Sequence, residues 1–296
     1  MPPLNRRTLL AAIGTSLLVG PARAQGTPAT PGGFAGRVFV NERGGLRLHT
    51  YMAAPQGALV TSHVIEGPGG LILVDGQFVP SAAAELKAYV ASIGKPVARA
   101  ILSHAHPDHW FGFHHLGRMP VHAGPVTARF LREAGAGLIA QRKADSSVPE
   151  IAGELAPGTE TVAGVKLRVR RVLNTEAPEI MVIEVPAANA VIVQDLVYNK
   201  VHAFVNRQMD QWIEVLRGLE QDGSGSALIL AGHGEPTAPA ELKGLVRYLE
   251  TARPLIEARI GKEGEIKAVV EEMTRAFPDY RAAPLLELAL SYALKA

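Results

Sequence analysis

The feature that most constrains this chain is the segment Ser-His-Ala-His-Pro-Asp-His at positions 103–109. It follows the apolar run Val97–Leu102, which is predicted to be a short buried strand. A loop at the end of a buried strand holds reactive side chains on a rigid base. The chain has no cysteine, which excludes a disulfide framework, a cysteine nucleophile and a thiolate-ligated metal. Any metal ion must therefore be bound by His, Asp or Glu.

The spacing within this segment suits two neighbouring metal positions. In an extended segment, residues two positions apart point the same way, so His104 and His106 can bind one ion. The turn at the proline then directs Asp108 and His109 toward a second position. Imidazole and carboxylate ligands together suit zinc and related divalent ions.

The rest of the chain alternates strand and helix patterns. Strands are predicted at 58–66, 71–74, 97–102, 165–173, 180–185, 190–193 and 227–230. Helices are predicted at 81–93 and 209–220, and in about three segments from 238 onward. This order predicts an α/β layered domain, with residues 238–296 packed on it or forming a helical appendix.

Three more residues extend the pattern in chain order. Asp75 ends the apolar run 71–74, Asp195 follows the run 190–193, and His233 lies between two glycines. With them, residues 37–237 resemble the metallo-β-lactamase superfamily of metallohydrolases. The resemblance implies an αββα sandwich with metals at one edge between the sheets, followed by C-terminal helices at 238–296.

The resemblance also implies a site for two metal ions. One ion is expected on His104, His106 and Glu176, the other on Asp108, His109 and His233, with Asp195 bridging them and Asp75 orienting a ligand.

The third ligand departs from the majority pattern of the family, which supplies a histidine. No histidine lies between positions 122 and 202, and the loop there contains Thr-Glu-Ala-Pro at 175–178, similar to the alkylsulfatase branch. Glu176 is the favoured ligand, with Asn174 and Glu179 as alternatives. Two Zn ions per chain are expected. A carboxylate adds negative charge and makes the site harder, so Mn or Fe is an alternative to Zn.

Such a site predicts a hydrolase. Two ions can hold a hydroxide at neutral pH and polarise a substrate oxygen, and Asp108 can orient that hydroxide or carry its proton. The expected substrate is a small molecule with an ester-like bond: a sulfate ester, a carboxylic ester or a lactone. A β-lactamase and a non-catalytic periplasmic metal-binding protein are the alternatives. The glutamate weighs against the former and Asp108 against the latter.

Four residues are further candidates for substrate binding. Asn199, Lys200 and His202 follow Asp195 closely and are expected near the rim of the pocket. Trp110 directly follows the histidine motif and is expected to line an apolar pocket or to pack beneath the loop. Without a functional role, Lys200 would be a solvated lysine and His202 a surface histidine.

The first 24 residues are predicted to be a twin-arginine-type signal peptide, which implies export to the periplasm. Arg6 and Arg7 precede an apolar run of about 11 residues and an Ala-Arg-Ala cleavage pattern. That run is shorter than the roughly 20 residues needed to span a bilayer, so no stable membrane anchor is expected. Residues 25–36 are predicted to be a flexible lead-in.

The charge of the chain gives no sign of nucleic-acid binding. The segment 1–24 holds three of the 30 basic residues and none of the 28 acidic ones, so the remainder has 27 against 28. A nucleic-acid interface would need a clustered basic face.

Overall fold

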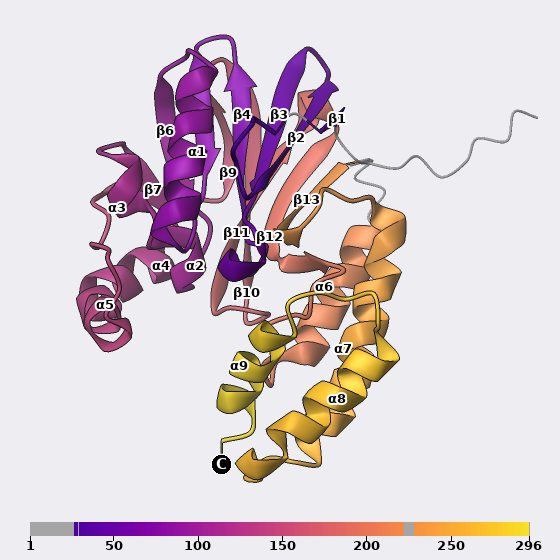
Figure 1. The fold of residues 1–296 in the computed structure, drawn as a ribbon. Helices are drawn as coiled ribbons and strands as arrows, with labels where there is room; N and C mark the ends of the chain where they lie inside the picture. The colour runs from indigo at the N-terminus through magenta and orange to yellow at the C-terminus, as the bar shows by residue number, and fades with distance from the viewer. Residues whose placement is uncertain (1–26, 29, 222–227, 296) are drawn as a thin grey trace, which may run out of the picture.

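The computed structural model describes residues 27–28, 30–221 and 228–295 (Figure 1). The strands are β1 (Thr27–Pro28), β2 (Arg37–Arg43), β3 (Leu46–Met52), β4 (Thr61–Gly67), β5 (Gly70–Val74), β6 (Val97–Leu102), β7 (Val121–Ala123), β8 (Ile151–Glu154), β9 (Gly158–Val162), β10 (Val165–Leu173), β11 (Glu179–Val185), β12 (Ala190–Asn199) and β13 (Leu228–Gly234). The α-helices are α1 (Pro80–Ser92), α2 (Pro107–Trp110), α3 (Phe113–Leu116), α4 (Pro125–Phe130), α5 (Ala136–Arg142), α6 (Met209–Gln221), α7 (Leu242–Glu257), α8 (Ile266–Ala276) and α9 (Ala283–Ala293). Short helical segments are η1 (Pro55–Gly57), the π-helical η2 (Leu131–Gly135), η3 (Pro186–Ala188), η4 (Pro239–Glu241) and η5 (Glu263–Glu265).

The strands form two sheets. The first runs in the order β1 to β8, antiparallel as far as β5 and parallel from β5 to β8. The second runs β13-β12-β11-β10-β9, with only the β12–β13 pair parallel. Helices α1 to α5 lie on the side of the first sheet, and α6 and α7 on the side of the second, while α8 packs on α7 and on α9 (Figure 1).

The apolar strands are buried on both faces, which explains why they read as continuous hydrophobic runs. In β5, Leu71 and Leu73 pack toward α1, whereas Ile72 and Val74 pack between the two sheets. Strand β11 repeats this alternation between the inter-sheet layer and the C-terminal helices. The predicted αββα sandwich with C-terminal helices is confirmed.

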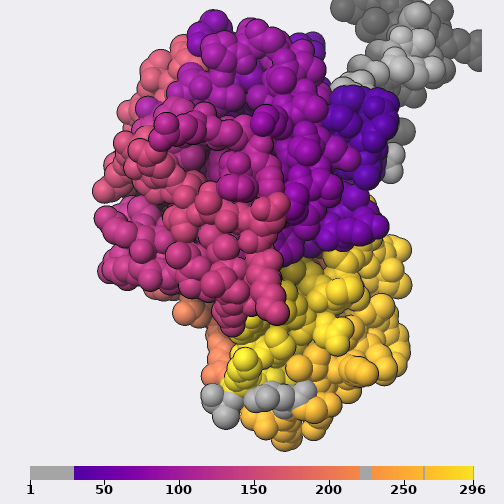
Figure 2. All heavy atoms as spheres, turned by 60° about the vertical axis from the view of Figure 1, so that its left-hand side comes forward, coloured from indigo at the N-terminus to yellow at the C-terminus, as the bar shows by residue number. Residues whose placement is uncertain are grey.

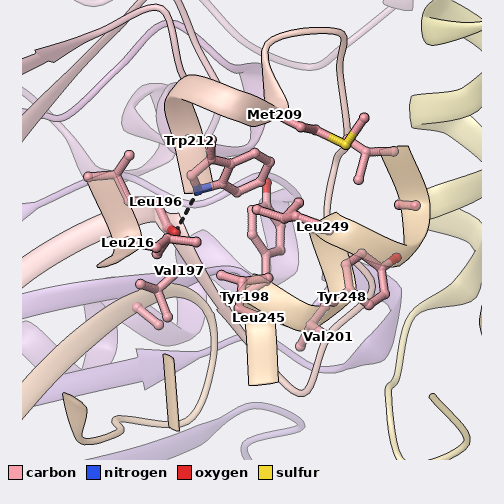
Figure 3. Close-up of a cluster of buried hydrophobic side chains, with 14 of the residues drawn as sticks. Leu196, Val197, Tyr198, Val201, Met209, Trp212, Leu216, Leu245, Tyr248 and Leu249 are labelled. Atoms are coloured by element: carbon pink, nitrogen blue, oxygen red, sulfur yellow. Dashed lines mark hydrogen bonds between the residues drawn. The ribbon is translucent and has the colours of Figure 1, made fainter. Parts of the chain in front are cut away.

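The C-terminal helices share a core with the second sheet. Trp212 of α6 is fully buried and donates its indole N–H to the carbonyl oxygen of Leu196 at 2.9 Å (Figure 3). Tyr248 and Leu249 of α7 pack in the same cluster. In the space-filling view, the C-terminal residues lie against the first half of the chain (Figure 2). Residues 238–295 therefore pack on the sandwich, with α7 next to the second sheet, and share its core.

Element boundaries differ from the predictions in places. Helix α1 begins at Pro80, because proline suits the first helical turn, with Val79 just before it. The predicted strand 190–193 continues to Asn199.

Most of the predicted lead-in at 25–36 lies within the described residues, and its end is attached to the domain. The backbone N–H groups of Ala35 and Gly36 donate to the Glu85 carboxylate. The predicted signal peptide at 1–24 lies outside the described residues. Among the described helices, none combines the length and apolar character that crossing a membrane requires.

Candidate metal centre

Strands of both sheets carry potential metal ligands at the same edge of the sandwich. Strands β5 and β6 are parallel, so Asp75 and His104, which follow them, lie side by side. In the second sheet, the parallel strands β12 and β13 carry Asp195 and His233. Val60, just before β4, bridges to His233 and ties the two sheets together at this edge.

An irregularity in β12 brings Asp195 to the edge. From residue 190 to 193, successive side chains point alternately into the layer between the sheets and toward the C-terminal helices. Leu196 and Val197 break this alternation, because both face the helices. The register shifts on either side of Gln194, which has a positive φ of 46°. Such a bulge re-aims a side chain, and here it turns the Asp195 carboxylate out of the apolar layer. Gly232 permits this arrangement, because a Cβ there would overlap an oxygen of Asp195.

The first group of potential ligands contains His104, His106, Glu176 and Asp195. One ligand atom from each lies within 4.8 Å of the others. The Glu176 Oε1 atom is 3.1 Å from Nδ1 of His106, and its Oε2 atom is 3.9 Å from Nε2 of His104. The Asp195 Oδ2 atom is 3.6 Å from the same His104 nitrogen.

The second group contains Asp108, His109, Asp195 and His233, again with ligand atoms within 4.8 Å. Nε2 of His109 is 3.1 Å from Oδ1 of Asp195. Nε2 of His233 is 3.2 Å from Oδ2 of Asp108 and 3.4 Å from Oδ2 of Asp195. Because Asp195 belongs to both groups, the arrangement is consistent with a dinuclear metal site.

The buried polar atoms in these groups fit divalent cations. Buried polar atoms are normally hydrogen-bonded. Although some of them lie close to one another, the following buried atoms of the two groups make no well-aligned hydrogen bond within the described part of the chain: Nε2 of His104, His109 and His233, Oε2 of Glu176 and Oδ1 of Asp195. Imidazole nitrogens and carboxylate oxygens are the ligands that zinc and related ions take.

The charges at the site also favour cations. Burial lowers the pKa of His106, but the Glu176 carboxylate outweighs it and raises that pKa to about 9. Burial likewise lowers the pKa of His233, and the Asp195 charge raises it to about 10. Burial raises the pKa of Asp108, yet the charges of His109 and His233 hold it well below its usual range. Protons on the imidazoles thus neutralise the carboxylates, and metal ions would displace those protons.

Asp75 orients a ligand from behind. Its carboxylate accepts the backbone N–H of Ser103 at 2.8 Å, the Ser103 hydroxyl at 2.7 Å and Nδ1–H of His109 at 2.7 Å. It also accepts a hydrogen bond from the Gln194 amide. Although Asp75 lies near enough to His104 and His109 to be a ligand itself, these donors already saturate its oxygens. It leaves Nε2 of His109 facing the metal position.

The third-ligand alternatives separate clearly in space. Glu176 is buried in the first group, and the Asn206 side chain donates to the carbonyl oxygens of residues 175 and 176 at 2.7 Å. Asn174 is exposed in the turn. Glu179 is buried elsewhere and accepts the backbone N–H and the hydroxyl of Thr127 at 3.0 and 3.1 Å. The geometry therefore supports Glu176 over the other two.

A pocket opens beside the two groups of ligands. It encloses about 100 Å³ and is lined mainly by apolar side chains. The residues around it are Ala58, Phe78, His106, Pro107, Asp108, Arg142, Asp195, Tyr198, Phe204, Leu285 and Leu288.

The four further candidates for substrate binding were Asn199, Lys200, His202 and Trp110. None of them lines this pocket in the part of the chain that the structure describes. The Asn199 side chain donates to the Glu235 carbonyl, and Lys200 is exposed. Trp110 is buried beneath the histidine loop and donates to the Ala105 carbonyl at 3.1 Å. His202 is buried against Tyr248.

The environment of His202 predicts a pH effect on stability. Burial lowers its pKa to about 4, whereas an unfolded histidine titrates near 6.5. Between these values the unfolded chain binds the extra proton, so His202 makes the protein less stable as the pH falls from about 6.5 toward 4. In His202→Phe, the free energy of unfolding should change less between pH 7 and 5, by up to about 1.4 kcal/mol per pH unit. Urea unfolding at several pH values measures this. If the unfolding free energy of wild type and of His202→Phe changed equally with pH, the prediction would be wrong.

Tyr198 is a functional candidate that sequence reasoning missed. Its hydroxyl donates to Oδ2 of Asp195 at 2.7 Å, with Oε1 of Glu176 also within reach at 3.2 Å. Its ring stacks on His233, with centroids 4.6 Å apart. Burial raises its pKa well above the usual value, so the hydroxyl remains a donor. A tyrosine in an apolar strand is typical of a core position, so no separate signal marks this one in the sequence.

Comparison with known proteins gives a family match and several distant structural neighbours. The sequence profile of the Metallo-beta-lactamase superfamily matches residues 56–233. No curated protein matches the chain at the significance required.

Among solved structures, the chain is similar to the inverting sec-alkylsulfatase Pisa1 from Pseudomonas sp., at 18% identity and a TM-score of 0.57. That match covers 82% of this chain and 48% of the sulfatase, so the chain spans about half the sulfatase's length. A metallo-beta-lactamase family protein from Thermus thermophilus gives 22% identity and a TM-score of 0.58 over 83% of this chain and 91% of that one. A beta-lactamase domain protein from Burkholderia ambifaria gives 20% identity and a TM-score of 0.61, and the match covers 84% of this chain and 88% of that one.

At these identities the structural neighbours support the fold alone. The profile match covers more than half of the chain, and it ends at His233, the last of the expected ligands. The chain belongs to the metallo-β-lactamase superfamily.

Proposed function

We propose that this protein is a hydrolase that uses two divalent metal ions to cleave an ester-like bond in a small molecule. The observation that carries this proposal is that two ligand groups share Asp195 and lie beside one apolar pocket. When bound, a pair of such ions lowers the pKa of water and polarises the oxygen of the bond to be cleaved.

The protein's own groups beside the pocket handle protons. The Asp108 side chain is 18% exposed and lines the pocket, so it can take a proton from the attacking water and pass it to the leaving oxygen. Tyr198 also lines the pocket, and its hydroxyl donates its one proton to Asp195 and so holds that carboxylate in place. The overall reaction consumes one water and yields an acid and an alcohol, or a single hydroxy acid where the bond is a lactone.

The choice of metal and bond follows from Glu176. Its carboxylate adds a negative charge where most of the family has a neutral imidazole, which makes harder ions such as Mn or Fe candidates beside Zn. Sulfate esters, carboxylic esters and lactones are the candidate bonds. The Thr-Glu-Ala-Pro loop supports ester cleavage over β-lactam cleavage. The position of Asp108 beside the pocket supports turnover over metal storage.

A substrate panel tests the proposal. We expect hydrolysis of at least one chromogenic carboxylic ester, sulfate ester or lactone, abolished by a chelator and restored by added Zn or Mn. Asp108→Ala should reduce turnover strongly, because it removes a proton carrier and a metal ligand. Turnover of nitrocefin alone would favour the lactamase. The absence of chelator-sensitive turnover on every compound would favour a metal-binding protein.

We further propose that the chain is exported to the periplasm by the twin-arginine route. This rests on the arginine pair and the short apolar run in residues 1–24. Replacing both arginines, Arg6→Lys and Arg7→Lys, should leave the uncleaved chain in the cytoplasm. Cell fractionation with immunoblotting measures this, and unchanged processing of the double variant would contradict it.

A further inference from the structure

The C-terminal helix α9 forms one wall of the pocket beside the metal ligands. Leu285 and Leu288 of this helix line the same space as His106 and Asp108. Helix α9 lies outside the segment that matches the family profile, which ends at residue 233. This wall is therefore a feature of the chain's C-terminal region, and it is placed to select substrates.

The outer part of this wall is apolar and exposed. Leu288 is 38% exposed and Tyr292, one turn further along α9, is 47% exposed. Phe204 connects this wall to the metal ligands, since its ring centroid is 5.4 Å from that of His106 and 6.1 Å from that of Tyr292. A substrate with an apolar chain could cover these surfaces while its ester bond lies at the ligands.

Arg142, the last residue of α5, also lines the pocket. Its Nη2 donates to the Tyr292 hydroxyl at 2.8 Å. No carboxylate of residues 30–221 or 228–295 forms an ion pair with it, whereas Arg37, Arg99 and Arg217 each pair with a glutamate. Its guanidinium, held by a neutral partner, is thus available to an anion, and it matches a planar carboxylate well.

We propose that the substrate is an ester whose apolar chain carries an anionic group. The chain packs against Leu285, Leu288 and Phe204, and Arg142 binds the anionic group. This inference rests on the proposed hydrolase function and specifies its substrate class. Tyr292, which holds Arg142, contacts Phe204, and Phe204 in turn contacts His106, so one apolar surface connects the metal ligands to the guanidinium.

The test uses matched pairs of compounds that differ only in the terminal group. For carboxylic esters the pair is p-nitrophenyl pentanoate and the p-nitrophenyl monoester of glutaric acid. The products, pentanoate and glutarate, serve as ligands for calorimetric titration of the metal-loaded protein. The titration does not depend on which ester class is cleaved. The protein is used as wild type, Arg142→Gln, Tyr292→Phe and Leu288→Ser.

We expect wild type to bind glutarate about tenfold more tightly than pentanoate, as a charge-assisted hydrogen bond would give. Arg142→Gln should abolish this preference. Pentanoate binding should stay within about twofold, since its one carboxylate is expected at the metal ions and its uncharged alkyl end does not use the guanidinium. Tyr292→Phe keeps the charge and should keep the preference. Leu288→Ser should weaken both ligands, because it removes apolar contact. Where the esters are cleaved, KM should follow the same order.

The outcomes separate this inference from the proposed function. If the substrate panel shows turnover but Arg142→Gln changes both ligands of the pair equally, or wild type shows no preference, the inference is wrong and the hydrolase stands. If no compound is hydrolysed in a chelator-sensitive way, the proposed function fails and this inference fails with it.

Discussion

Replacing Asp195 with asparagine is expected to lower the metal content from two ions per chain to at most one. Asp195 is the residue that belongs to both ligand groups, with Oδ1 facing His109 and Oδ2 facing His104 and His233. An amide keeps the shape but lacks the charge that offsets two cations. We expect kcat/KM to fall roughly a thousandfold, which corresponds to about 4 kcal/mol of transition-state stabilisation.

The same substitution at an exposed position is the matched control. Asp279 lies exposed between α8 and α9, and Asp279→Asn should keep both ions and wild-type activity. Elemental analysis and steady-state kinetics measure both variants. If Asp195→Asn retained two tightly bound ions and more than about a tenth of the activity, the shared-carboxylate geometry would be wrong.

The second large effect is expected at Glu176. In Glu176→Gln the first ligand group loses one of its two carboxylates and keeps only Asp195. The ion there should bind at least a hundredfold more weakly, since removing a group that merely hydrogen-bonds a metal ligand already costs up to about a hundredfold in affinity. Glu176→His restores an imidazole ligand and should retain both ions. A residue with only a structural role would not show this recovery.

Glu179 provides the control, because it is a buried glutamate three residues away in the chain. Its carboxylate contacts Thr127 instead of the histidines. Glu179→Gln should therefore keep two ions, even if it lowers the free energy of unfolding. Titration with zinc after chelation distinguishes the variants. Loss of an ion in Glu179→Gln but not in Glu176→Gln would reverse the assignment of the third ligand.

Much of the fold was predictable because its signals are local. The apolar runs of β5 and β11 read as buried strands, since both faces of each strand are covered, whereas in β6 only the second half, residues 100–102, is buried. The histidine motif lies directly after β6, where a loop can present its side chains. Asp195 and His233 could be proposed from their order in the chain, although their meeting depends on the pairing of β12 with β13.

The surroundings of the site were not predictable, because they depend on contacts between distant segments. Asn199 and His202 were expected near the pocket from their closeness to Asp195 in sequence. Strand β12 instead continues past the bulge at Gln194 to Asn199, whose side chain donates to the Glu235 carbonyl. His202, beyond the end of the strand, contacts Tyr248. The residues that do line the pocket, such as Arg142 and Leu285, arrive from α5 and α9. No spacing rule connects segments so far apart.

The direct test of the account is a metal titration of the chelated, purified protein, followed at once by elemental content and by hydrolysis of the best substrate from the panel. We expect two ions per chain at saturation, with full activity only when both are bound. Saturation at one ion, or hydrolysis that persists in the metal-free protein, would contradict the pair of ligand groups joined by Asp195.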